Sequence, residues 1–250
     1  MGNSLIHASL LLVGVSALGA ALPLLRPWSP RFLHFFVSIA AGVFLGAIFL
    51  HLLPELAQDT VGTAHDGHEA HAAVLPWAAA LAGLLALFVV QKILIEQDET
   101  RDPHEVVWFA TFLGLAAHSF TTGLGYASVL DDPALMTTFL GSMAVHKAGE
   151  SFSLASVMRL AHLPLWRSIG FLALYCLAAP LGLWLGDALS ASFAALGIAP
   201  LLTGLAVGTF LYVAVGDLLP EVFHGGGRLL GVTGLAIGLA LAWVGLLGHQ

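Results

Sequence analysis

The sequence predicts an all-α integral membrane protein with eight transmembrane helices and both termini outside the cytoplasm. Three observations carry this prediction: an apolar composition, eight long apolar runs, and basic residues confined to alternate links between the runs. Hydrophobic residues make up 58% of the 250 residues and charged residues only 9%, whereas a soluble domain usually carries about 25% charged residues. The mean hydropathy of +0.93 agrees. This composition argues against a soluble enzyme and against a disordered chain.

The residue counts also limit the partners and the chemistry. Eight Lys and Arg are too few for a basic face that binds nucleic acid, so we expect a lipid environment and no nucleic-acid partner. The one cysteine, Cys176, excludes an intrachain disulfide and a cysteine-rich metal site. Histidine is abundant in contrast, with twelve residues against eight Lys and Arg together.

Eight apolar runs are long enough to cross a bilayer as helices, which takes about 20 residues each. Strands of a membrane β-barrel would be about ten residues long and alternating in polarity, unlike these runs. The first run is predicted to be an uncleaved span rather than a signal peptide, because no positive charge precedes it. The predicted spans are Leu5–Leu25, Phe32–Leu56, Ala73–Ile93, Val106–Leu130, Leu135–Leu160, Leu165–Leu185, Pro200–Val222 and Leu229–Leu247.

Positive charge orients these spans. Seven of the eight basic residues lie at links on one side of the predicted membrane, and the eighth, Lys147, lies inside a span. Because positive residues favour the cytoplasmic side, the termini are predicted to lie outside, in a plasma or inner cell membrane. The seven are Arg26, Arg31, Lys92, Arg101, Arg159, Arg167 and Arg228.

An internal repeat relates the second and seventh spans at an offset of 166 residues. Segment 40–55 matches segment 206–221 at eight of sixteen positions, including a Leu-Leu-Pro-Glu string at the end of each. The two spans are predicted to run in opposite directions, which is the pattern of an inverted repeat and is common in secondary transporters. Chance similarity between two apolar helices is the alternative.

The repeat suggests how the chain is organised. We expect a single transmembrane domain over 1–250, with helices 1–3 and 6–8 as the inverted repeat and helices 4–5 between them. The repeat halves would cover about 1–93 and 163–250, and the central helices about 106–160.

The central helices carry ionisable groups inside the predicted membrane, where such groups are costly and usually functional. His146 and Glu150 are four residues apart and share one helix face. The short link 131–134 makes the fourth and fifth spans antiparallel neighbours. His118 and Lys147 each lie 13 residues from this link, so at about 1.5 Å per residue the two polar groups reach the same depth.

Two imidazoles and a carboxylate that converge in this way can hold a divalent transition metal. Because imidazole binds metal only when neutral, acid would weaken binding. The alternative is a hydrogen-bonded polar group that packs two helices, with Lys147 neutralising Glu150. The predicted metal ligands are His118, His146 and Glu150, with Ser119 and Thr122 as weaker candidates.

Further polar residues lie toward both faces of the membrane. His51 and Glu55, four residues apart, lie near the outer end of the second span, and Asp217 and Glu221, with the same spacing, lie near the inner end of the seventh. We expect them to line the path of the ion. The alternative is that they are helix-end residues that reach lipid headgroups or solvent.

An outer loop adds a histidine-rich tract with His65, His68 and His71. Such a tract can collect metal ions at the mouth of a path, and a solvated loop without a role is the equally weighted alternative.

At these residues the chain resembles the ZIP (ZRT/IRT-like) family of metal transporters. Four strings carry the resemblance along nearly the whole chain. They are Leu52–Glu55, which reads Leu-Leu-Pro-Glu; His118–Gly123, which reads His-Ser-Phe-Thr-Thr-Gly; His146–Leu154, which reads His-Lys-Ala-Gly-Glu-Ser-Phe-Ser-Leu; and Gly208–Val213. The resemblance implies eight spans, movement of metal into the cytoplasm, a homodimer and no catalytic cofactor.

Two residues depart from the pattern of the family. Thr122 stands where the family usually has Asp or Glu, which removes a carboxylate ligand. Lys147 stands where members with two adjacent metals have an acid, and a fixed ammonium group opposes a second dication. We therefore expect one transported metal ion, with Lys147 supplying the charge compensation that a second metal gives elsewhere.

The predicted function is transport of a divalent transition metal, zinc in the first place, by alternating access through the mid-membrane site. Fe²⁺, Mn²⁺ and Cd²⁺ overlap with zinc in ligand preference. One alternative is an intramembrane metal-dependent hydrolase, but the chain has no His-Glu-x-x-His string. The other is a cation-coupled carrier of a small solute, which would need more polar side chains in spans 1, 3, 6 and 8.

Overall fold

A computed structural model describes residues 2–26, 28–61, 70–95, 103–126, 133–223 and 227–247. Within these ranges the secondary structure is helical, and no strand occurs among them. Six helices of the described chain are long and apolar enough to cross a membrane, and Arg228–Val244 is a shorter apolar helix. The prediction of an all-α membrane protein is therefore confirmed, while the count of eight spans stays a prediction. The six are Ser4–Leu25, Pro30–Gln58, Val74–Ile93, Glu105–Gly125, Leu165–Ser192 and Ala199–Glu221.

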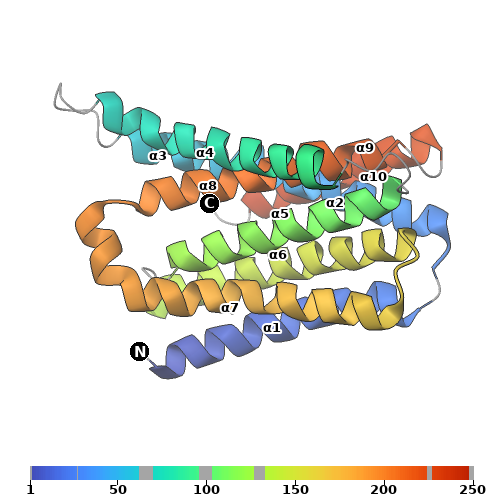
Figure 1. The fold of residues 1–250 in the computed structure, drawn as a ribbon, viewed down its shortest axis with the longest axis horizontal. Helices are drawn as coiled ribbons and strands as arrows, with labels where there is room; N and C mark the ends of the chain where they lie inside the picture. The colour runs from blue at the N-terminus through green and yellow to red at the C-terminus, as the bar shows by residue number, and fades with distance from the viewer. Residues whose placement is uncertain are drawn as a thin grey trace.

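The helices lie side by side along the long axis of the molecule (Figure 1). Helix α1 begins and helix α10 ends toward the same end of the bundle (Figure 1). Three of the helical rods change to π-helical winding along their length. In chain order the elements are α1 (Gly2–Leu25), α2 (Pro30–Ala47), η1 (Ile48–Leu52), α3 (Leu53–Val61), α4 (Ala70–Val90), η2 (Gln91–Ile95), α5 (Pro103–Tyr126), α6 (Pro133–Leu160), α7 (Leu165–Leu196), α8 (Ala199–Tyr212), η4 (Val213–Leu218), α9 (Leu219–Glu221) and α10 (Arg228–Leu247).

Two of the π-helical segments end on the first leucine of a repeated Leu-Leu-Pro-Glu string. Pro54 and Pro220 have no backbone N–H, so each interrupts the normal hydrogen-bond pattern of its helix. Just before each proline the backbone bonds five residues back, from Leu53 N–H to the Ile48 carbonyl and from Leu219 N–H to the Ala214 carbonyl. The same local sequence thus produces the same local winding in both halves of the chain.

His162 lies in the turn between α6 and α7 and ends α6; the sequence predicts no role for this residue. His162 has a φ of 53°, the left-handed conformation that ends many helices. Its N–H donates to the Arg159 carbonyl at 3.1 Å, and the Leu163 N–H donates to the Met158 carbonyl at 3.0 Å. Pro164 follows and prevents the helix from continuing. This turn sends α7 back along the bundle.

Glycines allow the closest helix crossings. The most extensive helix pairs are α1 with α6, α5 with α7, α2 with α10, and α4 with α8. A Cβ atom at Gly42 would collide with the backbone of Leu235 in α10, and one at Gly208 would collide with the backbone of Ala80 in α4. Gly42 and Gly208 are equivalent in the sequence repeat, so the two matched segments have a glycine at the same position of a close helix crossing.

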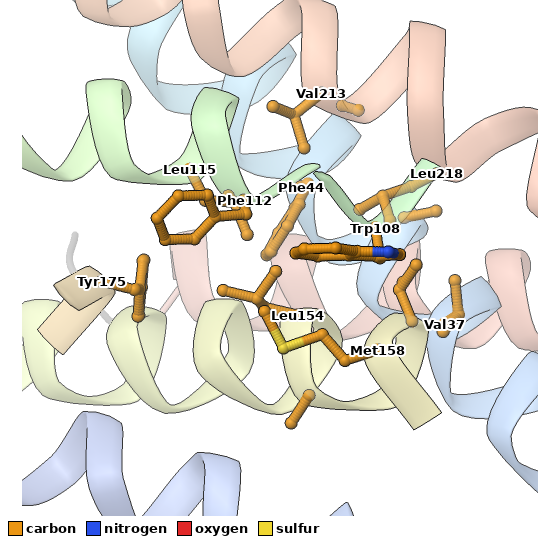
Figure 2. Packing of buried hydrophobic residues seen from close by; sticks show 14 of the residues in the cluster. Val37, Phe44, Trp108, Phe112, Leu115, Leu154, Met158, Tyr175, Val213 and Leu218 are labelled. Atoms are coloured by element: carbon orange, nitrogen blue, oxygen red, sulfur yellow. The ribbon is translucent and has the colours of Figure 1, made fainter. Parts of the chain in front are cut away.

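Aromatic and aliphatic side chains fill the centre of the bundle. Figure 2 shows residues of this core, which come from α2, α5, α6, α7 and the α8–η4 rod. Many large apolar side chains on α1, α4, α7 and α10 face outward instead, as expected of a surface that contacts lipid. The labelled core residues are Val37, Phe44, Trp108, Phe112, Leu115, Leu154, Met158, Tyr175, Val213 and Leu218.

The glycine contacts make a prediction about stability. Gly42→Ala and Gly208→Ala should each destabilise the protein by about 1–3 kcal/mol, the usual cost of overpacking, because backbone atoms must shift to admit the methyl group. Gly170→Ala is the matched control, since nothing lies within 4 Å of a Cβ at this position. It should be neutral or stabilising, because alanine is the better helix former. Thermal unfolding in detergent measures the difference, and equal midpoints for the three variants would contradict the packing described.

Candidate metal site

Three ionisable side chains converge in the interior of the bundle. His118 on α5 and His146 and Glu150 on α6 each place one ligand atom within 4.8 Å of the other two. Within the described ranges they form the only group of three or more His, Cys, Asp or Glu residues with this geometry. The structure therefore brings together the residues that the sequence predicted to meet at one depth.

The two oxygens of Glu150 face different partners. Oε1 lies 2.8 Å from Nε2 of His146 and 3.5 Å from Nε2 of His118. Oε2 accepts hydrogen bonds from Nζ of Lys147 at 2.5 Å and from the Ser119 hydroxyl at 3.2 Å. The Tyr175 hydroxyl donates to the same oxygen. One oxygen thus belongs to the group of potential metal ligands, and the other is held by donors.

His118 is held with one ring nitrogen directed at Glu150. Its Nδ1 lies 3.0 Å from the carbonyl oxygen of Ala206 on α8. A carbonyl can only accept, so Nδ1 carries the hydrogen and Nε2 keeps the lone pair that a metal needs. Thr122 lies one turn further along α5, with its hydroxyl 3.5 Å from His118 Nε2.

Two phenylalanines from the neighbouring helices cover the histidines. The Phe210 ring on α8 stacks on the His118 ring, with 4.1 Å between centroids and 14° between planes. The Phe44 ring on α2 lies 4.8 Å from Phe210 and 6.1 Å from His146. Phe44 and Phe210 are equivalent in the sequence repeat, so the two repeat segments meet at this site.

Burial differs among the members of the site. The side chains of Glu150 and Lys147 are 0% and 1% exposed, and that of His118 is 3% exposed. His146 is 22% exposed and is the most accessible of the potential ligands. The charged pair of Lys147 and Glu150 is therefore removed from solvent, while part of the His146 side chain lies at the surface of the protein.

The weaker candidates and the pathway residues take several environments. Ser119 is buried, and its hydroxyl also accepts from Lys147 Nζ at 2.6 Å. His51 lies half-buried in η1, and Glu55 is exposed in α3. Neither of these two residues belongs to the group around Glu150. His65 and His68, which are predicted to lie in an outer loop, are outside the described residues, as is the side chain of His71.

The two residues predicted to line the inner end of the path are buried. Asp217 in η4 is 1% exposed and Glu221 in α9 is 3% exposed. Oε1 of Glu221 lies 3.1 Å from Nδ1 of His34, a residue of α2 to which the sequence assigned no role. Glu221 thus packs against α2.

Tyr175 is the residue of the site that sequence reasoning missed. It lies on α7, which carries none of the predicted ligands, and its side chain is buried. The available signal was its rarity, because the chain has only three tyrosines and this one interrupts an apolar span. A buried phenol hydroxyl usually finds a hydrogen-bond partner, but the sequence does not tell which partner.

Comparison with known proteins identifies the family. The family model described as ZIP Zinc transporter matches residues 3–105 and 95–244. The chain belongs to the ZIP zinc transporter family. Members of this family are transporters and not enzymes, which agrees with the prediction and removes the hydrolase alternative.

Relatives of this ZIP protein come from bacteria and vertebrates. It is 27% identical over 254 residues to the zinc transporter ZupT of Corynebacterium aurimucosum, covering 94% of each chain. It is 26% identical over 245 residues to the zinc transporter ZIP1 of Takifugu rubripes, covering 81% of this chain and 80% of the relative. It is 30% identical over 181 residues to the zinc transporter ZIP9-A of Xenopus laevis, covering 66% and 58%.

The buried ion pair makes a prediction about stability in this ZIP protein. Lys147→Met should destabilise the metal-free protein by about 3–5 kcal/mol, because it leaves the carboxylate of Glu150 buried without its counter-charge. Added zinc should restore part of the loss, since a bound dication can replace the ammonium group. Thermal unfolding with and without zinc measures both effects.

The matched control is Lys92→Met, which removes a lysine from an exposed position at the end of the α4 rod. It should change the unfolding midpoint little, because exposed charge pairs contribute about 0–1 kcal/mol. If Lys147→Met were no more destabilising than Lys92→Met, the ion pair of Lys147 and Glu150 would not contribute to the stability of the protein.

Proposed function

We propose that this ZIP protein carries a divalent transition metal ion, zinc in the first place, across the membrane into the cytoplasm. The observation that supports this proposal most directly is the convergence of His118, His146 and Glu150 in the interior of a protein that belongs to a metal-transporter family. The relatives named above are all zinc transporters by name, which favours zinc as the ion.

The proposed transport site uses three protein atoms. Nε2 of His118, Nε2 of His146 and Oε1 of Glu150 would bind the ion, and water or the hydroxyl of Thr122 would complete the coordination. Three protein ligands with an open fourth position are typical of zinc sites that exchange ligands. Such a site can take up an ion from one side and release it to the other, which a closed four-ligand site does not favour.

The site is proposed to hold a single ion. Lys147 places its ammonium group 2.5 Å from Glu150 Oε2, where it supplies positive charge and opposes a second dication. Thr122 supplies a hydroxyl where the family usually has a carboxylate, so the ion is held by fewer charges. We expect weaker binding and easier release as a consequence.

The proposed architecture is a single domain of eight spans with an inverted repeat. The helix pairs support it: if spans 1, 2 and 3 correspond to 6, 7 and 8, and span 4 to span 5, then α1–α6 corresponds to α7–α5 and α2–α10 to α8–α4. The matched π-helical segments and the matched glycines also agree with this relation.

The path of the ion is proposed to run through both repeat halves. His51 and Glu55 would serve the outer passage, and Asp217 and Glu221 the inner passage. Alternating access would come from movement of the helices that carry the site against the helices that carry these residues. The exposure of Glu55 and the burial of Asp217 and Glu221 are consistent with different degrees of access at the two ends.

Zinc uptake into proteoliposomes tests the site. Glu150→Ala and His146→Ala should each reduce saturable uptake by about tenfold or more, because each removes one of three ligands; loss of even outer-shell partners typically costs about 10–100-fold in metal affinity. The measurement is the initial rate of zinc entry reported by an internal fluorescent chelator.

Glu105→Ala and His7→Ala are the matched controls, since both residues are exposed and lie outside the group around Glu150. Their uptake should equal that of the unchanged protein. Undiminished saturable uptake by both Glu150→Ala and His146→Ala would reject the site assignment.

Thiol labelling tests the proposed topology. In a Cys176→Ala background the chain has no cysteine, so single cysteines can be placed at Asn3 and at Arg31. A membrane-impermeant maleimide should label Asn3→Cys in intact cells and should label Arg31→Cys only after the membrane is opened. Labelling of both positions in intact cells, or of neither, would contradict the orientation with the N-terminus outside.

A further inference from the structure

We propose that Tyr175 is a specificity-determining positioning residue. With Lys147 and Ser119 it holds one oxygen of Glu150, so that Glu150 binds the metal through Oε1 alone and the site favours four-coordinate zinc over ions that need six ligands. This inference rests on the transport site proposed above. It adds the coordination mode of Glu150 and the residue that sets this mode.

The first step is the saturation of Oε2. Each carboxylate oxygen offers about two lone-pair positions. Oε2 accepts from three donors, which are the ammonium group of Lys147, the hydroxyl of Ser119 and the hydroxyl of Tyr175. A metal ion could therefore bind Oε2 only by displacing these donors, and the cost of displacing them falls with each donor that is removed. Oε1, in contrast, lies within 3.5 Å of both imidazole Nε2 atoms.

The second step is the origin of the three donors. Ser119 comes from α5, Lys147 from the helix of Glu150 itself, and Tyr175 from α7. The Tyr175 hydroxyl therefore constrains the carboxylate from an element that carries none of the proposed ligands. Lys147 Nζ also lies 5.9 Å from the centroid of the Tyr175 ring, a cation–π distance, so the tyrosine holds the counter-ion as well as the carboxylate.

The third step is the cost of changing the coordination. For Glu150 to bind a metal through both oxygens, Oε2 must leave donors that are buried and out of reach of water. Tyr175 is 1% exposed and Ser119 is 1% exposed, so neither hydroxyl can replace the lost bond with solvent. A buried donor left without a partner is unfavourable. The resting arrangement of Glu150 is therefore the one-oxygen mode.

The fourth step is the ligand count. One oxygen of Glu150 and two imidazole nitrogens make three protein ligands, and one water makes four, which is the tetrahedral number that zinc prefers. Manganese prefers six oxygen-rich ligands. The Phe210 ring stacks on His118 and the Phe44 ring lies beside His146, so apolar rings occupy part of the space around the imidazoles that additional waters would need. The rings of Phe44 and Phe210 and the binding of Glu150 through one oxygen thus both disfavour an ion with six ligands.

Cobalt(II) is a suitable probe, because its visible absorption is intense in tetrahedral sites and weak in octahedral ones. The unchanged protein loaded with Co²⁺ should show the intense tetrahedral spectrum, and Glu150→Ala should lose it. Tyr175→Phe, which removes the hydroxyl and keeps the ring, should shift the spectrum toward the weaker five- or six-coordinate form. In proteoliposomes its ratio of Mn²⁺ to Zn²⁺ uptake should rise by about tenfold, as loss of one hydrogen bond to a charged group allows.

Tyr212→Phe is the matched control. Tyr212, on α8, is also buried and also donates its hydroxyl to a side-chain oxygen, but that oxygen belongs to Gln91 and not to Glu150. It should leave both the cobalt spectrum and the uptake ratio unchanged. If Tyr175→Phe fails to fold, Ser119→Ala removes another donor from Oε2 and should shift the spectrum in the same direction.

The outcomes separate the two proposals. Absence of any Co²⁺ spectrum that depends on Glu150 in the unchanged protein would overturn the transport site and this inference with it. A spectrum that depends on Glu150 but stays the same in folded Tyr175→Phe and Ser119→Ala would overturn this inference and leave the transport site standing. A spectral shift without a change in the uptake ratio would overturn the role in selectivity.

Discussion

The site depends on the ion pair of Lys147 and Glu150, which lies among apolar helices with almost no exposure. A lone carboxylate in such surroundings would cost several kcal/mol. The lysine offsets its charge at a separation of 2.5 Å, and the hydroxyls of Ser119 and Tyr175 add donors to the same oxygen. The remaining oxygen is thereby left facing the two imidazoles. Without the pair, a carboxylate at this depth would have no stable charged form with which to attract a metal ion.

Close helix packing is what lets the ion pair collect its donors. Gly123 on α5 lies against the backbone of Ala179 on α7, and Gly182 on α7 lies against the backbone of Phe120 on α5. These contacts bring α7 near enough for Tyr175 to reach Glu150. Larger side chains at either glycine would move α7 away, and the hydroxyl would lose its bond. Packing and electrostatics are thus coupled through a few small residues.

The helical membrane architecture and the convergence of the three central candidate ligands were predictable from local pattern. His146 and Glu150 are one turn apart, and the short link before α6 places His118 at their depth. The environments of Asp217 and Glu221 were less predictable, because helical spacing shows which face two residues share but not which helix that face meets. The contact of Glu221 with His34 joins residues 187 positions apart in sequence, at 221 and 34. No pattern within one span indicates such a pairing.

By itself the sequence determined that the chain is an apolar helical membrane protein with two histidines and a glutamate on neighbouring helices. These properties follow from composition and from the helical period, which act within a segment. Only the tertiary structure decided how the oxygens of Glu150 are divided, with Tyr175 and Ser119 on one and the imidazoles beside the other. That division requires three helices to pack at side-chain distance, and packing between helices depends on the shapes of surfaces that are distant in the sequence.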